Sequence, residues 1–395
     1  MENFKYYAPT QVLFGKGVEE QAGELVRQFG GTKVLLHYGG GSVKRSGLLE
    51  RVAASLKAAG VAWIEWGGAV PNPRLSKVKE GIELCRAEGV DFLLAVGGGS
   101  VIDSCKAIAY GIPYDGDVWD FYSRKAVPKE ALPVGCVLTI AAAGSEMSDS
   151  SVITNEDGWI KRGLSSDLCR LRFSLLNPEL TCTLPAYQTA SGCTDIISHT
   201  VERYFTGPES VEPTDSIAEG LVRAVMDAAR RVVKDPRDYD ARATIMWAGS
   251  LSHNGLTGCG HSKNGKVGDF ACHQIEHELS AKFDVTHGAG LAAIWGAWSR
   301  YVMPSAPARF ARFARNVMGI AEEDDEKAAL MGIAAYEDFL REIGMPTTIG
   351  ELGIELTPEL IDELAWRCSF QGTRTIGSIR VLDLEDMKEI YRLAK

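Results

Sequence analysis

The first half of the chain alternates short apolar runs with amphipathic stretches, and this alternation narrows the possible folds more than any other feature. The apolar runs predict strands and occupy residues 33–38, 61–66, 91–96 and 133–139. Helical periodicity predicts helices at 48–59 and 75–87, and a further helix from Val101. Strands that alternate with helices in this way form parallel sheets with helices on both faces. We therefore predict an α/β, Rossmann-like domain.

After Pro185 the pattern changes, because strand-like runs nearly vanish and helical periodicity dominates. The predicted helices occupy residues 186–206, 211–234, 238–254, 268–282, 288–303, 307–318 and 325–343. A chain of 395 residues is also too long for a single core of ordinary size. We predict two domains, an α/β domain at residues 1–184 and an all-α domain at residues 185–395.

Two glycine triplets follow predicted strands and precede predicted helices. They are Gly39-Gly40-Gly41-Ser42 and Gly97-Gly98-Gly99-Ser100. Backbone N–H groups at such a turn, together with the N-terminus of the helix that follows, favour phosphate binding. Neither triplet matches the G-x-G-x-x-G fingerprint, and a tight strand-to-helix turn explains either one alone equally well. Two triplets in one sheet favour a dinucleotide-binding site.

The residues around the first triplet bear on which dinucleotide binds. NAD sites usually hold the ribose hydroxyls with an acidic residue, whereas NADP sites offer a cation to the 2′-phosphate. No carboxylate occurs between His37 and Arg45, while Lys44 and Arg45 follow the triplet. We therefore predict NADP(H), held through Lys44 or Arg45. NAD(H) is the alternative if these two cations are ordinary solvated residues.

The second half contains two pairs of metal-competent side chains, each with the spacing of one helical turn. Asp195 and His199 form the first pair, His273 and His277 the second, and His287 follows. Residues at i and i+4 lie on the same face of a helix, and imidazole and carboxylate groups bind divalent metals. These could instead be core or surface histidines with local hydrogen bonds, but their clustering favours a metal site. One of the three later histidines is expected to be spare, and His277 is the candidate, close enough to relay protons.

Charge and cysteine content limit the partners and the location of the protein. A net charge of −10 and an isoelectric point near 5.4 argue against a nucleic-acid or anionic-membrane partner. No apolar run approaches the roughly 20 residues that span a bilayer, and the N-terminus lacks the pattern of a signal peptide. The nine cysteines include no C-x-x-C pair, which indicates reduced thiols and predicts a cytoplasmic protein.

Several motifs are typical of one enzyme family. They are Tyr38-Gly39-Gly40-Gly41-Ser42-Val43-Lys44, Pro71-Asn72-Pro73, Gly97-Gly98-Gly99-Ser100-Val101-Ile102-Asp103, Gly144-Ser145-Glu146-Met147, Val152-Ile153-Thr154-Asn155 and the segments 192–203 and 271–290. The segment 271–290 is the most specific of them. Over essentially its full length, the chain resembles the iron-containing (group III) alcohol dehydrogenases, and within them the branch of butanol dehydrogenases and NADPH-dependent aldehyde reductases.

The resemblance implies a two-domain fold like that of dehydroquinate synthase, with the metal and the cofactor in the cleft between the domains. It implies reversible hydride transfer between NADP(H) and a primary alcohol or aldehyde, such as butanol or butanal, in a homodimer. The implied metal is Fe²⁺, although Zn²⁺ suits the same ligands.

The resemblance also assigns individual residues. Metal ligation falls to Asp195, His199, His273 and His287, and His277 lies beside the site, where we expect it to pass the proton to solvent. Cofactor contacts fall to Gly39, Gly40, Ser42, Asn72, Gly98, Gly99, Ser100, Asp103, Thr139 and Lys161. Two positions depart from the family pattern. Ala143 replaces a threonine whose hydroxyl would face the cofactor, and Ser150 stands where relatives often have asparagine.

Two other functions remain as alternatives. A dehydroquinate synthase-like lyase needs a basic cluster around the metal to hold its anionic substrate, but the metal segments are poor in basic residues, with Arg203, Lys263 and Lys266 the nearest. In a metal-dependent hydrolase the glycine triplets would be turns only. A non-catalytic metal-binding scaffold is disfavoured, because structural sites are usually closed and sulfur-rich.

Overall fold

The computed structural model describes residues 1–263 and 265–395. The chain forms two compact units. We name them the α/β unit, which comprises Tyr7–Thr183, and the helical unit, which comprises Leu184–Lys395 together with Met1–Tyr6. The first six residues thus belong to the unit that the second half of the chain forms.

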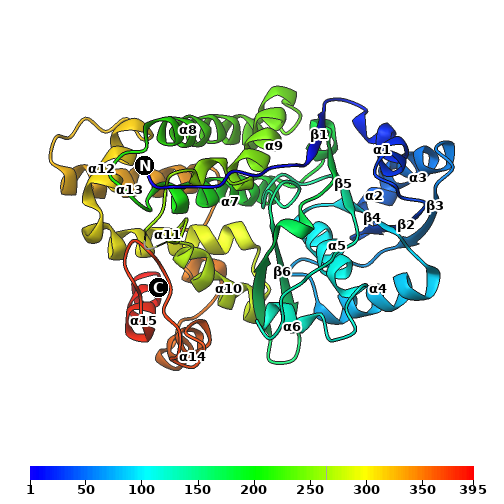
Figure 1. Ribbon diagram of the computed structural model, residues 1–395. Helices are drawn as coiled ribbons and strands as arrows, with labels where there is room; N and C mark the ends of the chain where they lie inside the picture. Colours follow the sequence, from blue (N-terminus) through cyan, green and yellow to red (C-terminus); the bar gives the residue numbers. More distant parts are fainter. Residues whose placement is uncertain (264) are drawn as a thin grey trace. The chain divides into compact units, whose positions relative to one another are not determined.

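The α/β unit contains a six-stranded sheet in which every neighbouring pair is parallel (Figure 1). In spatial order its strands are β1 (Gln11–Phe14), β8 (Phe173–Leu176), β5 (Val134–Leu138), β4 (Phe92–Gly97), β2 (Lys33–Tyr38) and β3 (Ala62–Trp66). The four strands predicted from apolar runs are confirmed. The sequence pattern does not predict β1 and β8, because strands of four residues are too short to show a period.

Helices connect these strands, because parallel strands need long crossover connections. They are α1 (Ala22–Gln28), α2 (Ser42–Arg45), α3 (Leu48–Ala58), α4 (Leu75–Glu88), α5 (Gly99–Gly111) and α6 (Trp119–Tyr122). All six residues of β4 are buried, which explains its uninterrupted apolar run. A separate antiparallel hairpin consists of β6 (Ser150–Asn155) and β7 (Ile160–Ser165), which the sequence pattern does not predict.

The order of the strands creates a topological switch point between β2 and β4. The chain runs from β2 to its neighbour β3 on one side, and from β4 to its neighbour β5 on the other. Open α/β sheets bind their ligands at the carboxyl ends of strands where neighbouring connections leave in opposite directions. Both glycine triplets follow these two strands, so the fold places them where a dinucleotide is expected.

The helical unit consists mainly of long helices (Figure 1). They are α7 (Ala186–Tyr204), α8 (Glu212–Lys234), α9 (Tyr239–His253), α10 (Ala271–Phe283), α11 (His287–Val302), α12 (Pro307–Asn316), α13 (Asp325–Glu342), α14 (Pro358–Cys368) and α15 (Leu384–Leu393). The predicted helices correspond to α7 through α13. Helical periodicity does not predict α14 and α15, although Thr357 and Asp383 cap them with their side chains.

Helix α10 begins at Ala271 and not at residue 268 as the periodicity predicts. The difference has a local cause, because Gly268 and Phe270 both have positive φ angles, of 83° and 51°, which a right-handed helix excludes.

Trp295 and Trp298 are fully buried and belong to the core. In the part of the chain that the structure describes, no helix is both long enough and apolar enough to cross a membrane.

Candidate active site

Helix α7 presents two of the predicted metal ligands from its buried face. Asp195 and His199 lie one turn apart and are 3% and 6% exposed, respectively. The Nε2 atom of His199 lies 3.6 Å from Oδ1 of Asp195. A carboxylate with so little access to water needs a compensating partner.

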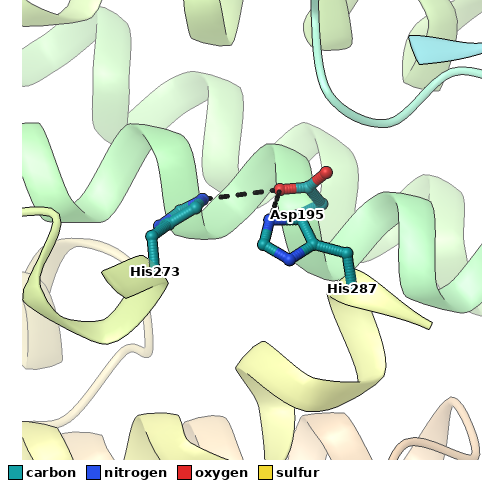
Figure 2. Close-up of side chains that lie close together, drawn as sticks. All are labelled: Asp195, His273 and His287. Atoms are coloured by element: carbon teal, nitrogen blue, oxygen red, sulfur yellow. Dashed lines mark ion pairs between the residues drawn. The ribbon is translucent and has the colours of Figure 1, made fainter. Parts of the chain in front are cut away.

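Two further helices bring imidazoles to the same oxygen. His273 on α10 and His287 at the start of α11 point toward Asp195 on α7, as Figure 2 shows. Their Nε2 atoms lie 3.6 Å and 3.8 Å from Oδ1 of Asp195. The donor atoms of Asp195, His273 and His287 all lie within 4.8 Å of one another. The structure thus gathers all four predicted ligands around one point.

A glycine at the start of α11 permits this arrangement. A Cβ atom added to Gly288 would lie 1.9 Å from the backbone oxygen of Ser191 on α7. Only glycine allows the two backbones to come this close. The contact sets the position of the adjacent His287 relative to α7.

Two buried carboxylates orient two of these imidazoles, and the sequence pattern alone does not single out either carboxylate. Glu202 accepts a hydrogen bond from Nδ1 of His273, and Glu276 accepts one from Nδ1 of His287. These bonds turn Nε2 of each ring toward Asp195 and increase its basicity. A signal existed for Glu202, because it follows His199 by three residues and therefore lies on the same face of α7.

The donor set fits a divalent metal ion of the Fe²⁺ or Zn²⁺ type. Among the described residues, Oδ1 of Asp195 and Nε2 of His273 are buried without a hydrogen-bond partner. Ligands bound about 2.0–2.2 Å from a tetrahedral cation are roughly 3.3–3.6 Å apart, close to the separations of 3.6–3.8 Å found here. Imidazole nitrogen together with carboxylate oxygen suits either metal.

The pKa values of His199 and His273 are shifted in opposite directions. Burial lowers the pKa of His199 well below its usual value, and His253 and His273 lower it further. Burial also acts to lower the pKa of His273, but Glu202 and Asp195 outweigh it and raise that pKa to about 9. The lowered pKa of His199 favours the neutral imidazole that a metal ion requires, whereas the carboxylates beside His273 favour its protonated form when no cation is bound.

His277 lies beside this cluster and not in its centre. Its ring centroid is 5.6 Å from that of His287, and its side chain is partly exposed. It forms a second group with Glu276 and His287, whose donor atoms also lie within 4.8 Å of one another. Its position suits a residue that exchanges protons with solvent.

Most of the predicted cofactor residues lie at the carboxyl ends of three adjacent strands. Gly39, Gly40 and Ser42 follow β2, Gly98, Gly99 and Ser100 follow β4, and Thr139 follows β5. The amide of Thr139 donates to the carbonyl oxygen of Gly97 at 3.0 Å, which joins two of these turns. The N-terminus of the 13-residue helix α5 begins at Gly99 and adds a favourable dipole for phosphate.

Asn72 and Lys161 form a buried pair in the same unit. Nζ of Lys161 on β7 donates to Oδ1 of Asn72 at 3.0 Å, and the two residues are only 6% and 7% exposed. Asn72 has a positive φ of 52°, a conformation that asparagine tolerates better than most residues. This hydrogen bond joins the turn at Asn72 to strand β7, although the two residues are 89 positions apart in the sequence.

Asp103 makes protein contacts through both carboxylate oxygens. It accepts a hydrogen bond from the hydroxyl of Ser145 at 2.6 Å and one from the amide of Val152 at 2.9 Å, and burial raises its pKa. These contacts fix the loop before β6. They indicate that Asp103 positions this loop.

A buried lysine, which the sequence pattern does not single out, holds the same loop. Nζ of Lys106 donates to the carbonyl oxygens of Ser145, Ser148 and Ser150 at 2.7–3.1 Å. The lysine is fully buried. Ser150, one of the two departures from the family pattern, therefore contributes its backbone to the loop. The other departure, Ala143, lies against the second glycine triplet, since a Cβ on Gly99 would be 3.2 Å from that of Ala143.

Comparison with known proteins identifies the family. The model of the iron-containing alcohol dehydrogenases matches residues 9–178, and the model of the C-terminal part of the Fe-containing alcohol dehydrogenase family matches residues 189–395. NADH-dependent butanol dehydrogenase A of Clostridium acetobutylicum is 40% identical over 394 residues, which cover 99% of each chain. NADPH-dependent aldehyde reductase YqhD of Escherichia coli is 34% identical and aligned over 100% of each chain.

A solved structure agrees with these matches. The crystal structure of NADH-dependent butanol dehydrogenase A from Thermotoga maritima superposes with a TM-score of 0.95 at 42% identity, covering 100% of this chain and 99% of the other. These relatives are dehydrogenases and a reductase, so they give no support to the lyase and hydrolase alternatives. The chain belongs to the iron-containing alcohol dehydrogenase family.

Proposed function

We propose that the protein is a metal-dependent alcohol dehydrogenase that interconverts a primary alcohol, such as butanol, and its aldehyde with NADP(H) or NAD(H). The observation that carries this proposal is the convergence of three imidazole nitrogens on Oδ1 of Asp195, all within 3.8 Å. The names of the relatives, a butanol dehydrogenase and an aldehyde reductase, support the substrate class.

The residues of the helical unit would hold one divalent cation, and the glycine turns of the α/β unit would hold the dinucleotide. When bound, the cation supplies a Lewis acid for the substrate oxygen, and the nicotinamide supplies or accepts the hydride. Glu202 and Glu276 keep the ligand imidazoles in their tautomer and orientation. Lys106 and Asp103 hold the loop that lies against the second glycine triplet.

The direct test is a spectrophotometric assay at 340 nm on protein loaded with Fe²⁺ or Zn²⁺. We expect oxidation of NADPH or NADH with short and medium aldehydes, and no turnover after the metal is removed by a chelator. Failure to bind either dinucleotide in the presence of metal would instead favour a hydrolase.

We assign proton exchange with solvent to His277. Replacing His277 with alanine should lower kcat by about 10²–10⁴-fold, which is the usual contribution of a general acid–base group. The metal content should stay at the wild-type level, because His277 lies outside the group that faces Asp195. Steady-state rates combined with elemental analysis check both points. A variant that loses its metal would identify His277 as a ligand.

We further propose that NADP(H) is preferred and that Lys44 or Arg45 recognises the 2′-phosphate. Both residues are exposed on α2, directly after the first glycine triplet, and Nζ of Lys44 lies 5.1 Å from the ring centroid of Tyr38. Changing both residues to alanine should raise KM for NADPH roughly 10–100-fold, since the loss of one hydrogen bond to a charged group, from whichever residue makes it, costs about 1.5–3 kcal/mol. KM for NADH should not change.

A matched control for that experiment is Lys57→Ala, which removes an exposed lysine from α3. It should leave both KM values unchanged. The C. acetobutylicum relative is an NADH-dependent enzyme by its name, so NADH is the competing cofactor to test. A wild-type protein with a lower KM for NADH than for NADPH would contradict the proposed preference.

We also propose that the enzyme is a cytoplasmic homodimer. The nine cysteines are free thiols, which suits a reducing compartment. Strand β1 ends the sheet and so presents an edge to which another strand can pair. Light scattering coupled to size-exclusion chromatography should give twice the chain mass of 42.8 kDa.

A further inference from the structure

The three imidazoles that converge on Asp195 are not held in the same way. Carboxylates accept hydrogen bonds from Nδ1 of His273 and from Nδ1 of His287. Nδ1 of His199 is buried and, within residues 1–263 and 265–395, has no hydrogen-bond partner. A metal-ligating histidine normally has its second nitrogen bonded, because that bond fixes the orientation of the ring. Something else must therefore orient His199.

Two rings pack against His199. The His273 ring is stacked with it at a centroid distance of 4.6 Å and an interplanar angle of 16°. The His253 ring is stacked with it at 4.0 Å and 27°. Rings stacked this closely on the same face would overlap, so the two cover opposite faces of His199. His273 is itself a predicted metal ligand, whereas His253, the last residue of α9, is not. His253 is thus the non-ligand ring that packs against His199.

Arg203 holds His253 in place. Its Nη2 atom lies 2.7 Å from Nδ1 of His253. Arginine can only donate, so Nδ1 of His253 accepts, and a neutral His253 ring carries its proton on Nε2. The result is a single tautomer and a single orientation for the ring that covers His199.

The guanidinium of Arg203 also donates hydrogen bonds to backbone carbonyl oxygens of both helices, α7 and α9. Nη1 of Arg203 donates to the carbonyl oxygen of His199 at 2.6 Å and to that of Ser252 at 2.9 Å. Arg203 is 7% exposed, and its Cζ atom lies 4.9 Å from the ring centroid of Phe270. It therefore joins the end of α7, next to His199, to the end of α9, next to His253.

We propose that His253 and Arg203 are positioning residues for the metal ligand His199. The His253 ring, fixed by Arg203, orients His199 by stacking, as Glu202 and Glu276 orient the other two imidazoles by hydrogen bonds. This inference rests on the proposed metal site. Its consequence is that metal retention depends on a ring that does not ligate the metal.

The test compares the affinity for Zn²⁺ of His253→Leu, His253→Phe, Arg203→Met and Arg203→Lys, measured by competition with a chromophoric chelator. His253→Leu and Arg203→Met should raise the Kd for Zn²⁺ about 10–100-fold, the usual effect of losing a support of a metal ligand. His253→Phe keeps a flat ring and should stay close to the wild-type Kd, and Arg203→Lys should recover part of the loss. The visible spectrum of the Co²⁺-loaded proteins should change in the first two variants, because it reports the ligand geometry.

The control is Trp247→Leu, which removes a 40% exposed ring from the same helix and should leave the Kd unchanged. Thermal melting of the metal-free proteins separates folding from metal binding. Wild-type Zn²⁺ affinity and Co²⁺ spectrum in both His253→Leu and Arg203→Met would overturn the inference. Equal losses in His253→Phe and His253→Leu would overturn it as well, because the ring would then not be the support. A wild-type protein that binds no Zn²⁺ would instead overturn the metal site itself.

Discussion

Replacing Asp195 with alanine should remove the bound cation and lower kcat/KM by at least about 10³-fold. Asp195 provides the carboxylate oxygen on which the three Nε2 atoms converge at 3.6–3.8 Å. Stabilisation of charge by a metal ion is worth several kcal/mol, and each 1.36 kcal/mol is about a factor of ten in rate. Initial rates with aldehyde and NADPH, together with elemental analysis of the purified variant, measure both effects.

The same variant should fold normally. Oδ1 of Asp195 has no hydrogen-bond partner among the described residues, so its removal leaves no protein donor unpaired at that atom. Binding of NADPH should also persist, since the predicted cofactor residues belong to the α/β unit. The matched control is Asp227→Ala, an exposed carboxylate on α8, which should retain full activity. An Asp195→Ala protein that keeps its metal would exclude Asp195 as a ligand.

Replacing Arg309 with methionine should lower the free energy of unfolding by about 3–5 kcal/mol, the usual cost of removing one partner of a buried ion pair. Arg309 on α12 is 2% exposed and makes a bidentate contact with the fully buried Asp215 at 2.7 Å and 2.9 Å. His261 lies 3.0 Å from the same carboxylate. The variant would leave the Asp215 charge buried with its main cation removed. Urea denaturation followed by circular dichroism measures the loss.

The pH dependence of this loss follows from Asp215. Burial acts to raise its pKa, but hydrogen bonds from His261, Arg309 and the amide of Val211 outweigh burial and lower the pKa below its usual value. A carboxyl with a lowered pKa stabilises the folded state above its unfolded pKa, and this contribution is lost as the pH falls through the folded value. The difference in stability between wild type and Arg309→Met should therefore be constant between about pH 5 and 8 and shrink in acid.

An exposed ion pair serves as the comparison for Arg309. Arg341 and Asp338 are 2.7 Å apart on α13, with side chains 51% and 77% exposed. Arg341→Met should cost no more than about 1 kcal/mol, because solvent screens such pairs. An equally small loss of stability in Arg309→Met would contradict the predicted contribution of the buried Arg309–Asp215 ion pair.

The sequence alone predicts those features that arise from local periodicity. Strand β4 is recognisable because every residue is buried, and the turn after it because glycine repeats where the strand meets α5. The Asp195 and His199 pair is recognisable because residues four apart share one face of a helix. The same reasoning predicts that metal ligands gather in the helical unit, and the structure brings them together.

The remaining features depend on contacts between residues far apart in the chain. Glu202 reaches His273 across 71 positions, and Arg203 reaches His253 across 50. In the sequence, Lys106 has no feature that distinguishes it from an ordinary helix residue. Its side chain is nevertheless fully buried, and its ammonium group donates to backbone carbonyl oxygens about 40 positions later in the sequence. Periodicity cannot reveal such contacts, because they form only when separate elements pack.

Anomalous X-ray diffraction from crystals of protein loaded with Fe²⁺ or Zn²⁺, recorded at the absorption edge of that metal, locates the ion itself. We predict one peak per chain, about 2.0–2.2 Å from Oδ1 of Asp195 and from Nε2 of His199, His273 and His287. A peak between Glu276, His277 and His287, or no peak in the helical unit, would contradict it.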